Sequence, residues 1–206
     1  MMMERALKIF LTGGVAVLCA LIVAGNVHDP GTNLLFVQHV FSMDTILPSS
    51  AMANHALPIP ALWPIGFWLI VLGEGLTAIL FALGTVELLR ARKFKARDFH
   101  HAKRFVFAGA GCGFLVWFIA FLAVGGEWFA MWQSQVWNGQ QAAFRILASI
   151  LLVLISSPNR MPSFDSRRAA ESGPSAIAMQ WQVCANTGDS ATWRTRQIDL
   201  GGRARD

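Results

Sequence analysis

The sequence predicts an all-α polytopic membrane protein, a four-helix transmembrane bundle. Of its 206 residues, 54% are hydrophobic and only 14% are charged, whereas soluble domains carry roughly 25% charged residues. A helix needs roughly 20 residues to cross a bilayer, and four apolar runs approach or exceed that length: 9–27, 63–89, 105–125 and 136–155. We therefore expect one transmembrane domain over 1–155 and a separate tail over 156–206.

The first run, 9–27, follows two basic residues, Arg5 and Lys8, as the apolar core of a secretory signal peptide also does. It is longer than the 7–15 apolar residues typical of a signal peptide. Ile22 also disrupts the small-residue pattern that a cleavage site before Gly25 requires. We therefore expect a membrane helix that is retained in the mature protein.

The connection that follows is long for a helical bundle and is not uniformly polar. Between residues 32 and 44 it holds several large apolar side chains, a stretch too short to cross a bilayer. We expect an outer amphipathic segment here, either on the membrane surface or re-entrant, followed by a proline-rich stretch with Pro48, Pro58 and Pro60.

The second run, 63–89, begins with Trp63 and Pro64, an aromatic and a helix-starting residue suited to a membrane interface. The connection 90–104 then carries seven Lys and Arg against one acid, Asp98, whereas the connections before the second run and after the third carry none. Because positive residues favour the cytoplasmic side, both termini are expected in the cytoplasm of a bacterial inner membrane. This pattern also explains the basic net charge without nucleic acid as a partner.

Glu74 is the most informative polar position, because an ionisable group within a membrane helix is costly and is usually paired or functional. It lies 11 residues after Trp63, or about 16 Å along a helix, and Arg145 lies 8 residues after Trp137, or about 12 Å. Their similar depth predicts a Glu74–Arg145 ion pair. Such a pair is either a structural clasp between helices or part of a proton or anion path.

Two further sets of residues have alternative interpretations. Gly109 and Gly113 form a helix-packing face, used either within the bundle or against a partner or second copy. An outer polar cluster is expected to form either a cation or proton site or ordinary turns and caps; its members are His28, Asp29, His39 and Glu127. Because no histidine falls inside the four apolar runs, we expect no haem, and we expect no other cofactor or metal.

Four segments carry a family resemblance: Asn26 to Pro30, Asn33 to Asp44, the Gly73-Glu74-Gly75 triplet, and Gly126 to Arg145, with sequence GEWFAMWQSQVWNGQQAAFR. Together they resemble a bacterial family of predicted small integral membrane proteins, domain of unknown function 2165. The likeness covers roughly residues 5 to 155. It implies four membrane helices and carries no activity, cofactor or catalytic residue.

The tail, 156–206, contains seven Arg and no Lys, and we expect it to be disordered or aberrant. No nucleotide-binding, nucleophile-elbow or metalloprotease motif occurs, so an enzyme is not expected. The leading hypothesis is a non-catalytic accessory or interaction subunit of a membrane complex, with a membrane protein or a second copy as partner besides the bilayer. The alternative is a small transporter or channel that uses Glu74 and Arg145.

Overall fold

The computed structural model describes residues 2–156, without the side chains of Ala96 and Arg97. The tail predicted over 156–206 lies, except for its first residue, outside this range. The described part contains helices and no strand. The helices are α1 (Met2–His28), α2 (Pro30–Ser42), η1 (Ala51–His55), α3 (Leu62–Ala91), α4 (Ala96–His101), α5 (Arg104–Gly113), η2 (Phe114–Trp128), η3 (Met131–Gln133) and α6 (Gln140–Ser156).

Three helical segments are long and apolar enough to cross a membrane: α1, α3, and Asp98–Trp128, which comprises the end of α4 together with α5 and η2. The fourth expected span corresponds to α6, which has 17 residues. At 1.5 Å per residue this is about 26 Å, less than the ~30 Å thickness of a typical hydrocarbon core. The all-helical membrane fold is confirmed with three candidate spans, and a fourth span stays a prediction.

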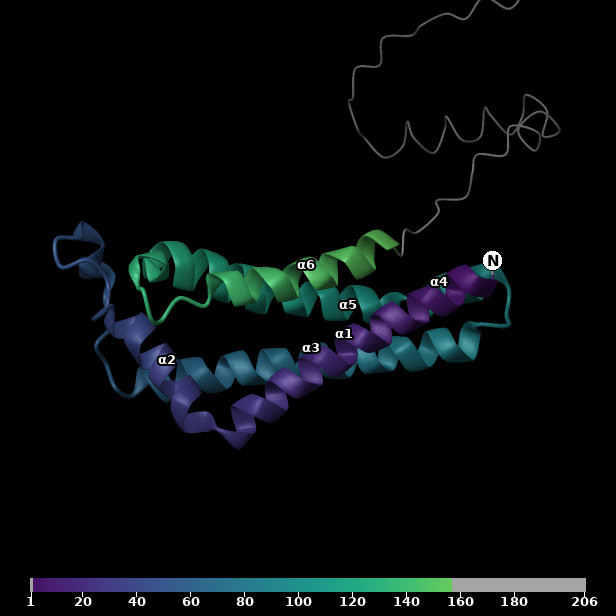
Figure 1. Ribbon diagram of the computed structural model, residues 1–206. Coiled ribbons are helices and arrows are strands. Elements are labelled where there is room, and N and C mark those ends of the chain that lie inside the picture. Colours follow the sequence, from purple (N-terminus) through teal and green to yellow (C-terminus); the bar gives the residue numbers. More distant parts are fainter. Residues whose placement is uncertain (1, 157–206) are drawn as a thin grey trace, which may run out of the picture. The chain divides into compact units, whose positions relative to one another are not determined.

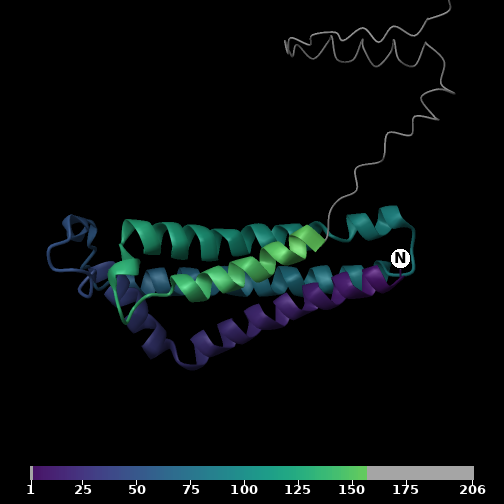
Figure 2. The ribbon, with the colours of Figure 1, turned by 45° about the horizontal axis from the view of Figure 1, so that its top comes forward.

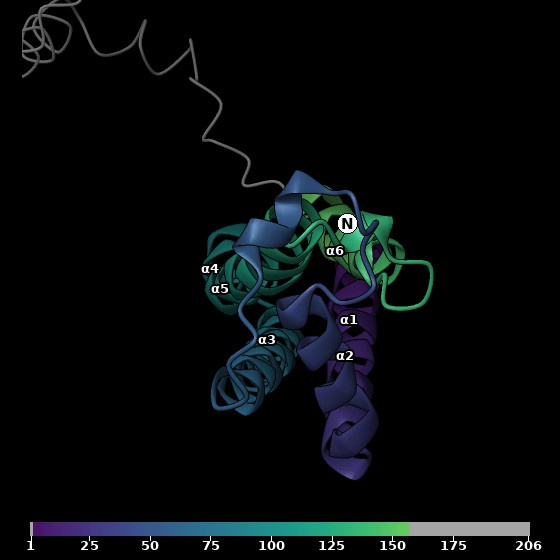
Figure 3. The ribbon, with the colours of Figure 1, turned by 90° about the vertical axis from the view of Figure 1, so that its left-hand side faces the viewer.

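The long helices lie lengthwise beside one another, and α2 crosses the end of the bundle opposite the N-terminus (Figures 1 and 3). Helix α3 packs against both α1 and α5, and α6 packs against η2 (Figure 2). The centre of the bundle is apolar, with Phe81, Trp117 and Ile150 each at most 1% exposed. Every long helix therefore turns one stripe inward and leaves its other apolar residues for the lipid.

Close helix contacts depend on glycine. A Cβ atom at Gly84 would lie 2.8 Å from Val106 Cγ2 and 3.1 Å from its backbone nitrogen, so α3 and α5 approach closely there. The expected packing face also points inward: Gly109 faces Phe81, and Gly113 faces Ile150. In this chain both glycines are used within the bundle.

The expected segment 32–44 contains a helix, α2. It begins after Asp29, whose Oδ1 accepts a hydrogen bond from the backbone N–H of Thr32 at 3.3 Å, and it ends at Met43, which adopts the left-handed conformation. Val37 and Val40 are buried against the bundle. The structure therefore places a helix here, and its outer location stays a prediction.

The third long helix changes its winding after Gly113. From Phe114 to Trp128 it is a π-helix, which closes hydrogen bonds between residues five apart, as in the bond from the Phe129 N–H to the Val124 carbonyl at 3.0 Å. Such wide turns are rare and are frequently found at functional sites. Here they carry Trp117 and Phe121 into the cavity described next.

Candidate intramembrane binding site

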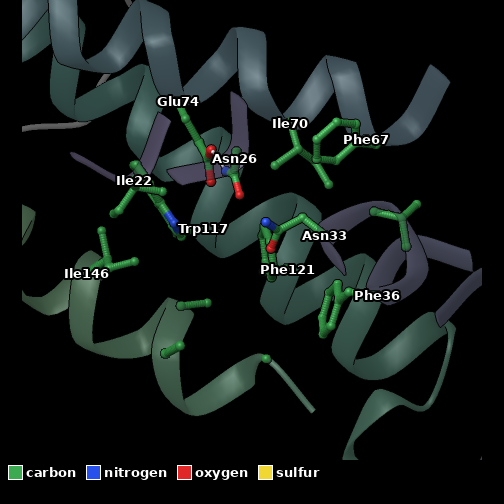
Figure 4. A pocket seen from close by; sticks show the side chains of 14 residues that line it. Ile22, Asn26, Asn33, Phe36, Phe67, Ile70, Glu74, Trp117, Phe121 and Ile146 are labelled. Atoms are coloured by element: carbon green, nitrogen blue, oxygen red, sulfur yellow. Dashed lines mark hydrogen bonds between the residues drawn. The ribbon is translucent and has the colours of Figure 1, made fainter. Parts of the chain in front are cut away.

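A cavity of about 270 Å³ lies among α1, α2, α3, η2 and α6. Its walls are mainly apolar, and three residues with carboxyl or amide groups line it: Asn26 from α1, Asn33 from α2 and Glu74 from α3 (Figure 4). Aromatic walls come from α2, α3 and η2: Phe36, Phe67, Trp117 and Phe121. These three polar side chains thus lie together in an otherwise apolar cavity between the helices.

Glu74 reaches this chamber because it continues the inward stripe of α3, which includes Val71 and Ala78. Its side chain is 3% exposed. The Asn26 amide nitrogen donates to Glu74 Oε2 at 2.6 Å, which joins α1 to α3 across the cavity wall (Figure 4). The acid therefore has a neutral hydrogen-bond donor as its partner.

The predicted Glu74–Arg145 ion pair is absent, so that prediction is wrong. Arg145 is exposed on α6, and its Nε donates to the Gln141 carbonyl at 3.3 Å. The reason is rotation about the helix axis: α6 turns Ala143, Leu147 and Ile150 inward, and Arg145, two residues after Ala143, falls on another face. Ion pairs elsewhere in the described residues include Lys8–Glu4, His39–Asp44 and Arg90–Glu87.

Asn26 was not predicted as the partner of Glu74, although the sequence contains a signal for it. The inward residues of α1 include Thr12 and Cys19, which are seven residues apart, and Asn26 follows Cys19 by seven more. Positions spaced by seven share one helix face. That repeat places the amide of Asn26 on the same stripe that contacts α3.

A second cavity, of about 210 Å³, adjoins the first and is almost wholly apolar. The two share Phe36, Val37, Ile70 and Phe121 as walls. The second cavity continues between α3 and η2, where its lining includes Gly66 and Gly125. The first cavity therefore contains polar side chains, and the second, next to it, is apolar.

The expected outer polar cluster does not come together as a unit. His39 Nδ1 lies 2.9 Å from Asp44, and its ring stacks on Trp137 with centroids 4.6 Å apart. Asp29 caps α2, and hydrogen bonds from Thr32 lower the pKa of its carboxyl. His28 and Glu127 are exposed. Within the described range, no three His, Cys, Asp or Glu residues are grouped to hold a metal ion.

Residues 4–158 match a known family, that of predicted small integral membrane proteins (DUF2165). The chain belongs to this family. The resemblance found in the sequence is confirmed, and the protein is an integral membrane protein with several apolar helices. No curated protein and no solved structure matches it significantly. The family match includes Asn26, Asn33 and Glu74, and it ends close to the start of the tail.

Proposed function

We propose that this protein is a non-catalytic membrane protein that binds a small amphipathic cation within the bilayer, with Glu74 as the acceptor of its charged group. The observation that carries the proposal is the buried carboxyl group of Glu74 on the wall of a 270 Å³ cavity. Within residues 2–156, the only hydrogen-bond donor to this carboxyl group is the Asn26 amide. An acid in a membrane helix is costly and is usually paired or functional. A bound cation would supply the missing charge.

The walls indicate the rest of the ligand. Apolar residues dominate both adjoining cavities, so a hydrocarbon portion can fill the second while an ammonium group meets Glu74 in the first. The rings of Phe36, Trp117 and Phe121 line the first cavity, and aromatic faces attract cations. An alkylammonium ion has this chemistry.

The test uses the full-length protein in mild detergent and measures its melting temperature with octylammonium or with octanol. We expect octylammonium to raise the melting temperature of the wild type and octanol to raise it far less. Glu74→Gln should abolish the difference, whereas Glu87→Gln should preserve it, because Glu87 lies on the same helix outside the cavity. If the difference between the octylammonium and octanol shifts were the same in Glu74→Gln as in Glu87→Gln, Glu74 would be rejected as the acceptor.

Transport is an extension of this proposal and corresponds to the alternative raised by the sequence. Without an Arg145 partner, Glu74 would act alone with Asn26 in any such path. Proteoliposomes should then take up a radiolabelled alkylammonium ion at a rate that falls with Glu74→Gln. Binding without uptake would leave a binding protein and exclude transport of this ion.

A second candidate is the accessory or interaction subunit, and two glycines favour it. Gly75 on α3 and Gly111 on α5 have nothing within 4 Å of an added Cβ, so these helix surfaces offer a close approach to a neighbouring helix. Purification at native expression should recover a stoichiometric partner that is lost with Gly75→Ile and Gly111→Ile. A lone chain or homo-oligomer would contradict the hetero-complex.

We also infer that residence is in a bacterial inner membrane with both termini in the cytoplasm. The support is the concentration of Lys and Arg in the first turns of α1 and in the segment 90–104, as the positive-inside pattern requires. Reporter fusions at each terminus and within 90–104 should all be active on the cytoplasmic side. A periplasmic reporter signal from 90–104 would reverse the topology.

A further inference from the structure

A separate cavity of about 520 Å³ lies where α1 begins and α3 ends, away from Glu74. Its lining contains three cations, Arg5, Arg92 and Lys93, and no acid. The rest of its wall is apolar and includes Phe10 and Leu89. Positive charge and hydrocarbon are thus combined in one hollow.

The cations are separated along the helix axes from the two large apolar residues Phe10 and Leu89. Phe10 is five residues beyond Arg5 on α1, or about 7.5 Å farther along the helix. On α3, Leu89 comes before the helix end at Ala91, and the two cations Arg92 and Lys93 come directly after it. Phe10 is 76% and Leu89 42% exposed, so both present hydrocarbon to the surroundings. The cations are therefore at the end of the span, next to the apolar wall.

Arg5 connects the first helix to the segment that follows α3. Its Nη1 donates to the carbonyl oxygens of Arg92 and Phe94, each at 2.8 Å, and its guanidinium lies 4.9 Å from the centre of the Phe99 ring. These contacts attach α1 to the chain that follows α3. Within residues 2–156, neither Arg92 nor Lys93 makes an ion pair, so both charges are available to an anion.

We propose that this hollow binds an anionic phospholipid, with its phosphate at Arg92 and Lys93 and an acyl chain along Phe10 and Leu89. A phospholipid has the same order of groups as the hollow, an anionic head next to hydrocarbon, and basic pockets between membrane helices recognise such heads. A free phosphate would use the cations and leave the apolar wall unused. The site is independent of the function proposed for Glu74.

The test is native mass spectrometry of the full-length protein released from detergent and titrated with phosphatidylglycerol, phosphatidylcholine of the same acyl chains, or inorganic phosphate. We expect phosphatidylglycerol to be retained preferentially. Because each Lys or Arg near a membrane surface contributes about 1 kcal/mol of attraction, or about fivefold in affinity, Arg92→Gln with Lys93→Gln should weaken its binding roughly 25-fold.

Two further double variants make the result specific. Arg90→Gln with Lys95→Gln removes two charges from the same connection outside the cavity lining and should retain the lipid. Arg92→Lys with Lys93→Arg keeps both charges and should also retain it, which separates charge loss from misfolding. Equal retention of both lipids, equal loss in the two Gln double variants, or displacement by inorganic phosphate would each overturn the proposal.

Discussion

The hydrogen bond between Asn26 and Glu74 gives the most direct test of how the bundle is held together. Asn26→Ala removes the donor that lies 2.6 Å from a carboxyl that is 3% exposed. An unsatisfied buried polar group costs about 1–3 kcal/mol, while hydrogen bonds between membrane helices average about 0.6 and reach about 1.7 kcal/mol. We therefore expect a loss of about 1–2 kcal/mol in the free energy of unfolding.

The assay is a double-mutant cycle on detergent-solubilised protein, with reversible unfolding in mixed micelles. The Asn26→Ala and Glu74→Ala pair should show a coupling of about 1 kcal/mol, above the roughly 0.3–0.5 kcal/mol deviation seen for independent sites. The same cycle with Arg145→Ala should give additive losses. Additivity for Asn26, or a larger coupling for Arg145, would refute the arrangement described here.

Three other predictions follow from local geometry. Gly84→Ala should destabilise the protein by about 1–3 kcal/mol, because its Cβ would meet the backbone of the facing helix; Gly111→Ala, with open space around it, should be neutral or stabilising by up to about 1 kcal/mol in the same unfolding assay. The pKa of Asp29 is lowered from its ordinary value of 3.8 by hydrogen bonds from Thr32, so its charge stabilises the fold above that pH and ceases to do so as the pH falls through the lowered pKa. The substitution Asp29→Asn should remove this acid-side decline from melting curves recorded against pH, and an unchanged decline would exclude the Asp29 cap as its source. Ala142→Leu should fill part of the 270 Å³ cavity that Glu74 lines and reduce the melting-temperature shift caused by octylammonium. An unreduced shift would place the ligand elsewhere.

The sequence predicted the all-helical membrane fold because each of the three candidate spans contains a continuous apolar run. The predicted helix boundaries were less accurate, for physical reasons. Helix α1 begins at Met2 rather than residue 9, since charged residues continue a helix readily and Lys8 pairs with Glu4 one turn earlier. Helix α6 begins at Gln140 rather than 136, because the Asn138 side chain accepts a hydrogen bond from the Gln140 N–H.

The candidate site was predicted in part. Glu74 was identified from the cost of an acid in a membrane helix, and its burial agrees with that reasoning. The partner of Glu74 was not identified, because the distance along a helix gives the depth of a residue in the membrane and does not give the direction in which its side chain points. Asn26 lies on an inward stripe that a seven-residue count reveals, whereas the cavity itself depends on packing among five elements and has no signal in the sequence.

The wide winding of the third long helix bears on how it fits a bilayer. The apolar part of this span, from Phe105 to Trp128, contains 24 residues, which as a regular α-helix would extend about 36 Å, more than the ~30 Å hydrocarbon thickness. A π-helical turn contains more residues, so the stretch from Phe114 to Trp128 rises less per residue. The winding thus reduces the hydrophobic mismatch that an over-long span otherwise relieves by tilting or by thickening the surrounding lipid.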